Sequence, residues 1–278
     1  MAERNKCVEA VILSLKEAGD KAQAVRVLSP TRGVFTATLW GGGKSRLRQL
    51  VQPFYSGDLY IYEKASTSSS PASPTIKDFD AKVFRPSLRE SLVKTSVCWA
   101  TCEVVAATEC AGEAERAFKL VTAFLDGIEA TSPDGARLSL LRFLRRYSSL
   151  LGLARSTTAC ASCGKPLAGE ALVWQGDEGF LCPQCAAYPY AAHSGAYSAT
   201  HSDAPYAALS GVPGDGQLKL GEEALSYLRA VDTLPPRVSR NAPLSKQAQR
   251  DLEEFLFDQM RRAAGHPLKA LDALSASM

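Results

Sequence analysis

The chain has 278 residues and a mass of 29.8 kDa, enough for about two domains of ordinary size. Hydrophobic residues make up 46% and charged residues 22% of it, which excludes a wholly disordered or fibrous chain. The 32 basic and 29 acidic residues leave a net charge of only +3, so the total charge identifies no partner. Residues 1–15 contain no long apolar run, and we expect no signal peptide, no membrane span and a cytoplasmic location.

The N-terminal part of the chain favours strands. Short runs rich in β-branched and aromatic residues alternate there with turn residues. The expected strands span residues 8–15, 22–28, 34–40, 59–63 and 75–83. Several short strands of this kind predict a small β-barrel, which we place in residues 1–83. The serine-rich loop at 66–73 precedes the last strand and is expected only to face solvent.

From residue 85 onward, hydrophobic residues recur at spacings of three and four, as in amphipathic helices. The expected helices span residues 88–105, 113–125, 138–151, 221–231 and 245–264. Ser245 is suited to cap the last of them and Gly265 to end it. The segment 188–216 shows no period and predicts a long irregular connection. The expected fold class is α+β, with a barrel followed by an all-α domain.

Four of the eight cysteines form two C-x2-C pairs with 18 residues between them: Cys160, Cys163, Cys182 and Cys185. Each pair can present two thiolates from one tight turn, and two such turns supply the tetrahedral sulfur cage that zinc prefers. Residues 172–174 and 179–181 look like a short hairpin between the pairs. A redox dithiol would need one pair in a βαβ unit. Because four cysteines leave no open coordination position, we expect one structural Zn²⁺.

Two stretches of the chain contain basic residues and no acidic ones. The first lies between Asp20 and Asp58, and its candidate contacts are Arg26, Arg32, Lys44, Arg46 and Arg48. The second runs over 135–169, where the helical period places three arginines on one face: Arg142, Arg145 and Arg146. A solvated face usually mixes both signs. Because binding to a phosphate backbone depends on the local surface, these stretches indicate one surface that binds nucleic acid.

Small barrels hold single strands with a basic groove for the backbone and aromatic faces for the bases. Phe35, Trp40, and Phe54 or Tyr55 are the aromatic candidates, although strand alternation must bury about half of such residues. Trp40 stands beside the glycines at 41–43 and is the aromatic residue that we expect to be exposed.

The remaining chemistry-bearing residues predict no catalytic site. Residues 43–45 read Gly-Lys-Ser, but Thr38 stands where a phosphate-binding loop requires glycine. The three histidines lack the H-x-E context of a zinc deaminase, and no Ser/His/Asp set can be picked out. We therefore expect no enzyme. Three of the other cysteines are expected to be buried thiols: Cys98, Cys102 and Cys110. Cys7 is isolated near the N-terminus and is assigned no role.

The order of several motifs resembles the bacterial recombination mediator family RecO. In the barrel the similar motifs are VIL at 11–13, GV at 33–34, GKSRL at 43–47 and LVQPF at 50–54. Further along they are FLRR at 143–146, LLGL at 150–153, CASCG at 160–164, LCPQC at 181–185 and GHPLK at 265–269. The resemblance covers nearly the whole chain, and the ordered combination is more specific than any single motif.

The resemblance implies an OB-fold barrel at 1–83 and the first part of a helical domain at 84–155. A four-cysteine zinc finger would follow at 156–190, and an irregular connection and the second part of the helical domain at 191–278. It also implies a non-enzymatic, nucleoid-associated mediator of recombinational DNA repair in a RecF-type pathway. Such proteins bind single- and double-stranded DNA, anneal complementary strands and, with RecR, help RecA replace single-strand-binding protein, whose C-terminal tail is a further partner.

The same resemblance implies that two groups of basic residues contact phosphate: Lys44, Arg46 and Arg48, and Arg142, Arg145 and Arg146. The segments 66–73 and 188–216 are longer than the family pattern leads us to expect, which leaves any partner surface there undefined. The residues also leave a second class open, a zinc-ribbon scaffold protein that binds RNA or a transcription complex. A preference for structured RNA would favour that alternative.

Overall fold

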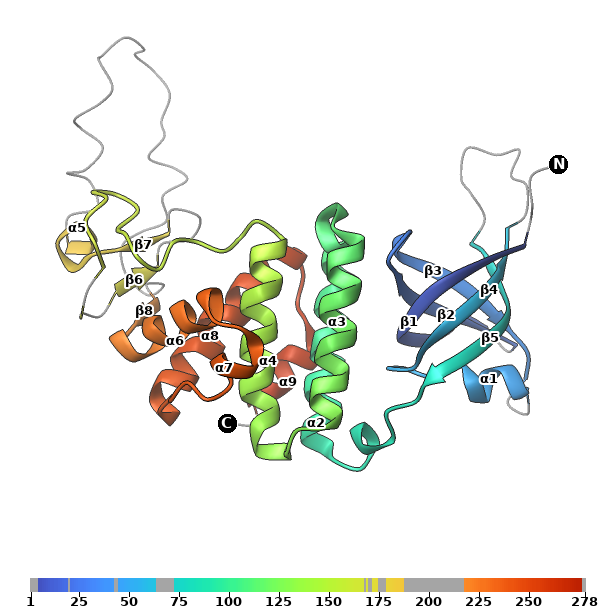
Figure 1. The fold of residues 1–278 in the computed structure, drawn as a ribbon. Coiled ribbons are helices and arrows are strands. Elements are labelled where there is room, and N and C mark those ends of the chain that lie inside the picture. Colours follow the sequence, from blue (N-terminus) through green and yellow to red (C-terminus); the bar gives the residue numbers. More distant parts are fainter. Residues whose placement is uncertain are drawn as a thin grey trace, which may run out of the picture. The chain divides into compact units, whose positions relative to one another are not determined.

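The computed structural model describes residues 5–19, 21–42, 45–63, 73–167, 169, 172–174, 179–187 and 218–276 (Figure 1). The chain divides into two compact units. The first consists of Met1–Leu153 together with Phe257–Met278, and the second of Ala154–Leu256. Within the described ranges, no helix combines the length and apolar character that crossing a membrane requires.

The N-terminal strands form a closed barrel in the order β1-β2-β3-β5-β4 (Figure 1). They are β1 (Asn5–Glu17), β2 (Ala22–Ser29), β3 (Gly33–Trp40), β4 (Ser56–Tyr62) and β5 (Thr75–Val83). All neighbours pair antiparallel except β3 and β5, which pair parallel. The short helix α1 (Arg46–Leu50) lies between β3 and β4 and was not predicted. The expected α+β class with an OB-type five-stranded barrel is confirmed.

The barrel closes around side chains that alternate along the strands, as a period of two requires. Its buried core includes Ile12 of β1, Val25 and Val27 of β2, Leu39 of β3 and Phe79 of β5. The residues between them, such as Arg26 and Thr36, face outward and lie opposite each other on β2 and β3. The register therefore defines an outer face on which surface groups can be placed.

The helical part of the first unit begins after β5. It contains η1 (Pro86–Arg89), α2 (Leu92–Thr108), η2 (Glu109–Gly112), α3 (Ala114–Glu129), α4 (Pro133–Leu150) and α9 (Lys269–Ala276). The first expected helix begins later than predicted, because Ser91 caps α2 by accepting from the Lys94 amide. Cys98, Cys102 and Cys110 are buried in this part, which confirms their predicted packing role.

Arg85 joins the barrel to the helices. Its side chain is only 2% exposed, and its backbone has a φ of 49°, in the left-handed region. The guanidinium donates to the Phe54 carbonyl at 2.6 Å and to the Ser56 hydroxyl at 2.8 Å. It also pairs with Asp126 of α3 at 2.7 Å. One buried cation thus satisfies groups at the start of β4 and on a helix.

The second unit contains a small sheet in the order β7-β6-β8. Its elements are β6 (Leu172–Trp174), β7 (Phe180–Leu181), α5 (Pro183–Ala187), β8 (Leu218–Leu220), α6 (Glu222–Thr233), α7 (Pro236–Ser239) and most of α8 (Lys246–Ala264). The predicted hairpin is confirmed by the antiparallel pairing of β6 with β7, whereas β8 was not predicted. Ser245 accepts from the Ala248 amide and Gly265 follows α8 with a φ of 69°, so both predicted ends are confirmed.

Candidate metal site and nucleic-acid interface

The two C-x2-C pairs come together in the second unit. The sulfur atoms of Cys160, Cys163, Cys182 and Cys185 all lie within 4.8 Å of one another. The Cys163 and Cys182 sulfurs are 3.9 Å apart. A tetrahedral zinc with bonds of about 2.3 Å requires sulfurs about 3.8 Å apart. The cluster therefore has the donor type and the spacing that a four-cysteine metal site requires.

Local backbone turns present these sulfurs. The Cys160 amide donates to the Lys165 carbonyl at 2.8 Å, and the Gly164 amide returns to the Cys160 carbonyl at 3.0 Å. Gly164 has a φ of 71°, which favours glycine over a residue with a side chain. The Cys182 amide donates to the Cys160 sulfur at 3.3 Å, which links the two turns. This is the knuckle geometry that the sequence spacing predicts.

The pKa values of two thiols in the cluster are shifted in opposite directions. Burial opposes ionisation of Cys160, but backbone N–H groups of Cys163, Cys182 and Ser162 outweigh it and lower the pKa to about 6. Hydrogen bonding with Cys182 and then Cys163 raises the pKa of Cys185 to about 12. Four sulfurs this close cannot all ionise without a compensating charge, which a divalent cation would supply.

Arg229 of α6 anchors the first knuckle to the rest of the second unit. Its Nε donates to the Thr157 carbonyl at 2.9 Å, and one Nη donates to the Leu167 carbonyl at 2.7 Å. The two carbonyls flank the first cysteine pair on either side. Sequence analysis did not identify this role, because α6 is distant in the chain and carries no motif.

Trp40, at the end of β3, is the most exposed of the predicted aromatic residues. Its side chain is 59% exposed, which confirms the prediction that it faces solvent. Arg46 is also exposed, on α1, and Lys21 is exposed before β2. Lys44 lies outside the described residues. Trp40 and Lys21 lie at the same end of the barrel, because Trp40 pairs with Ala22 and the Gly41 amide donates to the Lys21 carbonyl at 2.9 Å. The Ser45 amide donates to the Gly42 carbonyl at 2.9 Å, so α1 with Arg46 begins at this end as well.

The other predicted basic residues of the barrel make specific contacts within the protein. Arg26 bonds Thr36, the Ala106 carbonyl and Glu109, and Arg48 pairs with Glu17 at 3.5 Å with its side chain 15% exposed. Arg32 pairs with Glu63 and lies over the ring of Phe35. These contacts bring acidic groups from outside the acid-free stretch to the arginines. The count of basic residues in this stretch of sequence therefore overstates how much of its positive charge is unpaired in the folded protein.

The predicted basic face on α4 is wrong for one of its three residues. Arg145 is buried, with 2% of its surface exposed, while Arg142 and Arg146 are half-buried. Arg142 donates to Ser139 at 2.8 Å. The helix packs against both α2 and α3, and Ser148 bonds Gln259 of α8 at 2.6 Å. Because α4 is covered on several sides, a side chain opposite its most apolar face is still buried.

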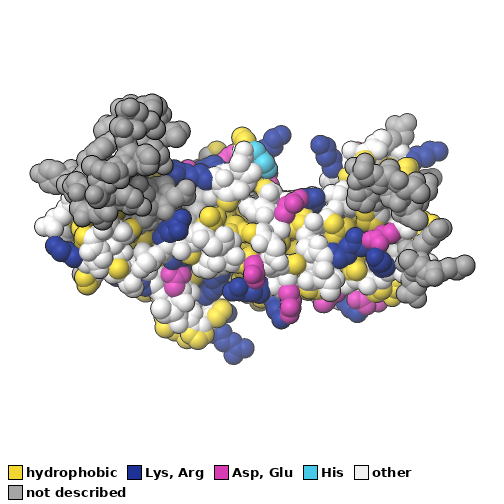
Figure 2. All heavy atoms as spheres, turned by 90° about the horizontal axis from the view of Figure 1, so that it is seen from above, with side chains coloured by type: hydrophobic (Ala, Val, Ile, Leu, Met, Phe, Trp, Pro, Cys, Tyr) yellow, Lys and Arg dark blue, Asp and Glu magenta, His cyan; other side chains and the backbone are white. Residues whose placement is uncertain are grey.

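A different part of the barrel surface is acidic. Strand register places Glu9, Asp58 and Asp80 in one row across β1, β4 and β5, with Lys82 bonded to Asp58 at 2.6 Å. Asp78 lies in the adjoining row, opposite Tyr60. Figure 2 shows that basic side chains on one face of the molecule form several small groups with acidic side chains among them. On the part of this face that the structure describes, positive charge is therefore divided into local groups.

The fold and the cluster together define a class: an OB-barrel protein with a helical body and a four-cysteine finger. Comparison with known proteins narrows that class. The family described as Recombination protein O C terminal matches residues 89–202. DNA repair protein RecO of Solidesulfovibrio magneticus is 31% identical over 182 residues, covering 64% of this chain and 72% of the relative.

Two further relatives carry the same name. DNA repair protein RecO of Maridesulfovibrio salexigens is 28% identical over 182 residues, covering 64% of this chain and 72% of the relative. That of a Synechococcus strain is 27% identical over 185 residues, covering 64% of this chain and 62% of the relative. The chain therefore belongs to the RecO family, as the order of its motifs predicted.

Proposed function

We propose that this protein is a mediator of recombinational DNA repair that binds single- and double-stranded DNA and anneals complementary strands without catalysing a covalent step. The observation that carries the proposal is the end of the OB barrel at Trp40, where Trp40 is 59% exposed and Arg46 is exposed nearby in the chain. The RecO relatives are named for DNA repair, which supports DNA as the ligand.

The residues proposed to contact DNA differ in how exposed they are and in what they already contact within the protein. Trp40, Arg46 and Lys44 are the strongest candidates, because the first two are exposed and the third adjoins them in sequence. Arg32, Arg48, Arg142 and Arg146 are retained as secondary contacts. Arg26 serves to fix the barrel against α2 and η2, and the buried Arg145 is not retained. The basic side chains at the Trp40 end of the barrel would attract DNA phosphates, whereas the acidic side chains on the β4–β5 side would repel them.

We assign the metal as one Zn²⁺ held by Cys160, Cys163, Cys182 and Cys185. The spacing of the four sulfurs and the all-thiolate donor set support zinc over harder cations. With four protein ligands the ion would be structural and would hold the two knuckles together.

We also propose that the chain is organised in four parts, with boundaries at residues 83, 155 and 190.

The proposed partners are RecR and single-strand-binding protein, through its C-terminal tail, with RecA acting on the product. The cytoplasm, in association with the nucleoid, is the proposed location. The alternative of an RNA-binding or transcription-associated zinc-ribbon scaffold predicts a preference for structured RNA. Membership of a family whose relatives are named for DNA repair favours the first proposal.

The affinity for single-stranded DNA is expected to fall steeply with salt. About six phosphate contacts predict a slope of log K against log salt near −4, since each contact contributes about −0.7. Arg46→Gln should reduce the magnitude of this slope by about 0.7. Trp40→Ala should cost about 1–3 kcal/mol of binding while leaving the slope unchanged, because it removes stacking and no charge. Fluorescence anisotropy over a salt series measures both effects.

Lys82→Gln is the matched control, since it removes one exposed positive charge from the acidic β4–β5 side. Its slope should equal that of the parent protein. A salt-insensitive affinity, or tighter binding to structured RNA than to DNA, would contradict the proposed function.

A further inference from the structure

A polar track crosses the outer face of the barrel from Trp40 towards the helices. Strand register places Ser14, Arg26 and Thr36 in one row across β1, β2 and β3. Lys16, Ala24 and Thr38 form the next row. Four of these six residues are small: Ser14, Ala24, Thr36 and Thr38. Arg26 is held by Thr36, the Ala106 carbonyl and Glu109, and Lys16 is exposed. A chain of phosphates and bases could follow these rows.

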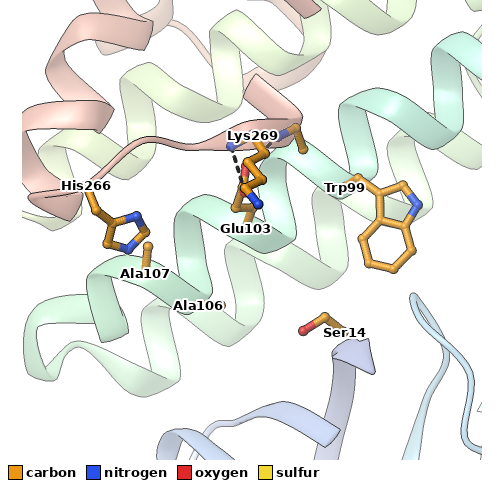
Figure 3. A pocket seen from close by; sticks show the side chains of 8 residues that line it. Ser14, Trp99, Glu103, Ala106, Ala107, His266 and Lys269 are labelled. Carbon is orange, nitrogen blue, oxygen red and sulfur yellow. Dashed lines mark hydrogen bonds between the residues drawn. The ribbon is translucent and has the colours of Figure 1, made fainter. Parts of the chain in front are cut away.

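The track ends at a pocket of about 450 Å³. Ser14 of β1 lines one side, and Trp99, Glu103, Ala106 and Ala107 of α2 line another (Figure 3). Three alanines, of which Ala270 is the third, leave room beside the indole of Trp99. A volume of this order lies within the range of small-ligand sites.

Trp99 is held in place from the barrel side. Its ring meets the ring of Phe54 edge-on, with centroids 5.0 Å apart. Phe54 is buried and has a φ of 71°, so the loop before β4 is shaped to make this contact. Trp99 is therefore a supported aromatic wall of the pocket, as a stacking platform requires.

The GHPLK motif at residues 265–269 forms the remaining wall. Leu268 is fully buried, whereas His266 and Lys269 are exposed and line the pocket. Both carboxylate oxygens of Glu103 fix this turn, by accepting from the amides of Lys269 at 2.9 Å and Ala270 at 2.8 Å (Figure 3). The turn is thereby oriented so that its basic side chains border the pocket that Trp99 lines.

We propose that a nucleobase of a bound single strand enters this pocket and stacks on Trp99, while Lys269 and His266 contact the adjoining phosphates. The inference rests on the proposed DNA binding and extends its path from Trp40 across the barrel to the helices. An acidic apolar peptide is the less favoured occupant, because the indole of Trp99 in the wall offers a flat aromatic face on which a nucleobase can stack. An aromatic wall with basic groups at its edge suits a nucleotide better.

The direct test is photo-crosslinking of the full-length, zinc-loaded protein to an oligothymidine that carries 5-iodo-2′-deoxyuridine. Crosslinked peptides, mapped by mass spectrometry, are expected to include Trp99 in addition to Trp40. Trp99→Leu should weaken binding about five-fold or more, the lower end of what one stacked base contributes. Since Trp99 also packs on Phe54, a second arm uses the exposed Lys269.

Lys269→Gln should reduce the magnitude of the salt slope by about 0.7, whereas Lys82→Gln should leave it unchanged. Crosslinks at Trp40 but none at Trp99, with an unchanged slope for Lys269→Gln, would overturn this inference and leave the proposed function intact. Binding of an acidic apolar peptide in the pocket, with no binding of a nucleotide there, would overturn it likewise. Failure of the parent protein to bind DNA in a salt-sensitive manner would instead contradict the proposed function.

Discussion

Cys160→Ser is expected to abolish metal binding and to unfold the cysteine knuckles of the second unit. Cys160 is 3% exposed, and its sulfur accepts from the Cys182 amide, so it lies at the centre of the cluster. Structural zinc contributes on the order of 10–16 kcal/mol in small zinc-finger peptides. The described strands β6 and β7 are short and could not replace that energy with a core of their own.

Elemental analysis should find one zinc per parent chain and almost none in the variant. Limited proteolysis should then cut the variant within residues 156–187 under conditions that leave this segment of the parent uncut. Cys7→Ser is the matched control, because Cys7 is exposed and distant in sequence from the cluster. A parent protein without metal, whose four cluster thiols are all freely alkylated, would refute the zinc assignment.

Arg85→Met is expected to lower the free energy of unfolding by about 3 kcal/mol, because hydrogen bonds to a charged group are lost and buried acceptors stay behind. Methionine retains much of the side-chain length but cannot donate to the Phe54 carbonyl or the Ser56 hydroxyl. Urea unfolding followed by far-ultraviolet circular dichroism measures the change.

Asp126→Asn provides the matched control for that prediction. The Asp126 side chain is 59% exposed, and solvent screens its pairing with Arg85. Its substitution should therefore cost less than about 1 kcal/mol. Equal stability of Arg85→Met and the parent protein would show that the buried arginine does not hold the barrel and helices together.

The fold was largely predictable because its strongest signals are local. The five barrel strands are short runs rich in β-branched and aromatic residues between turn residues, and each C-x2-C pair makes its own turn, so short windows of sequence contained both patterns. The motif order then led to the family. Neither β8 nor α1 was predicted, since β8 gains its partner β6 across a long stretch of chain and α1 is only one short turn.

The candidate interface was less predictable, because exposure and pairing depend on tertiary contacts. Arg26 meets Glu109, which is 83 residues away, and Arg145 is covered by packing on more than one side of α4. A helical wheel describes one helix alone and cannot show that several neighbours enclose it. Trp40 was placed correctly because the glycines beside it end the strand.

We propose that this chain mediates recombinational repair by bringing DNA strands together. Annealing of two complementary oligonucleotides, followed by fluorescence energy transfer in the absence of any nucleotide cofactor, tests it most directly. The zinc-loaded protein should accelerate annealing, and Arg46→Gln and Trp40→Ala should reduce the acceleration while Lys82→Gln should not. An annealing rate no faster than that of the free strands, together with salt-insensitive DNA binding, would contradict the claim.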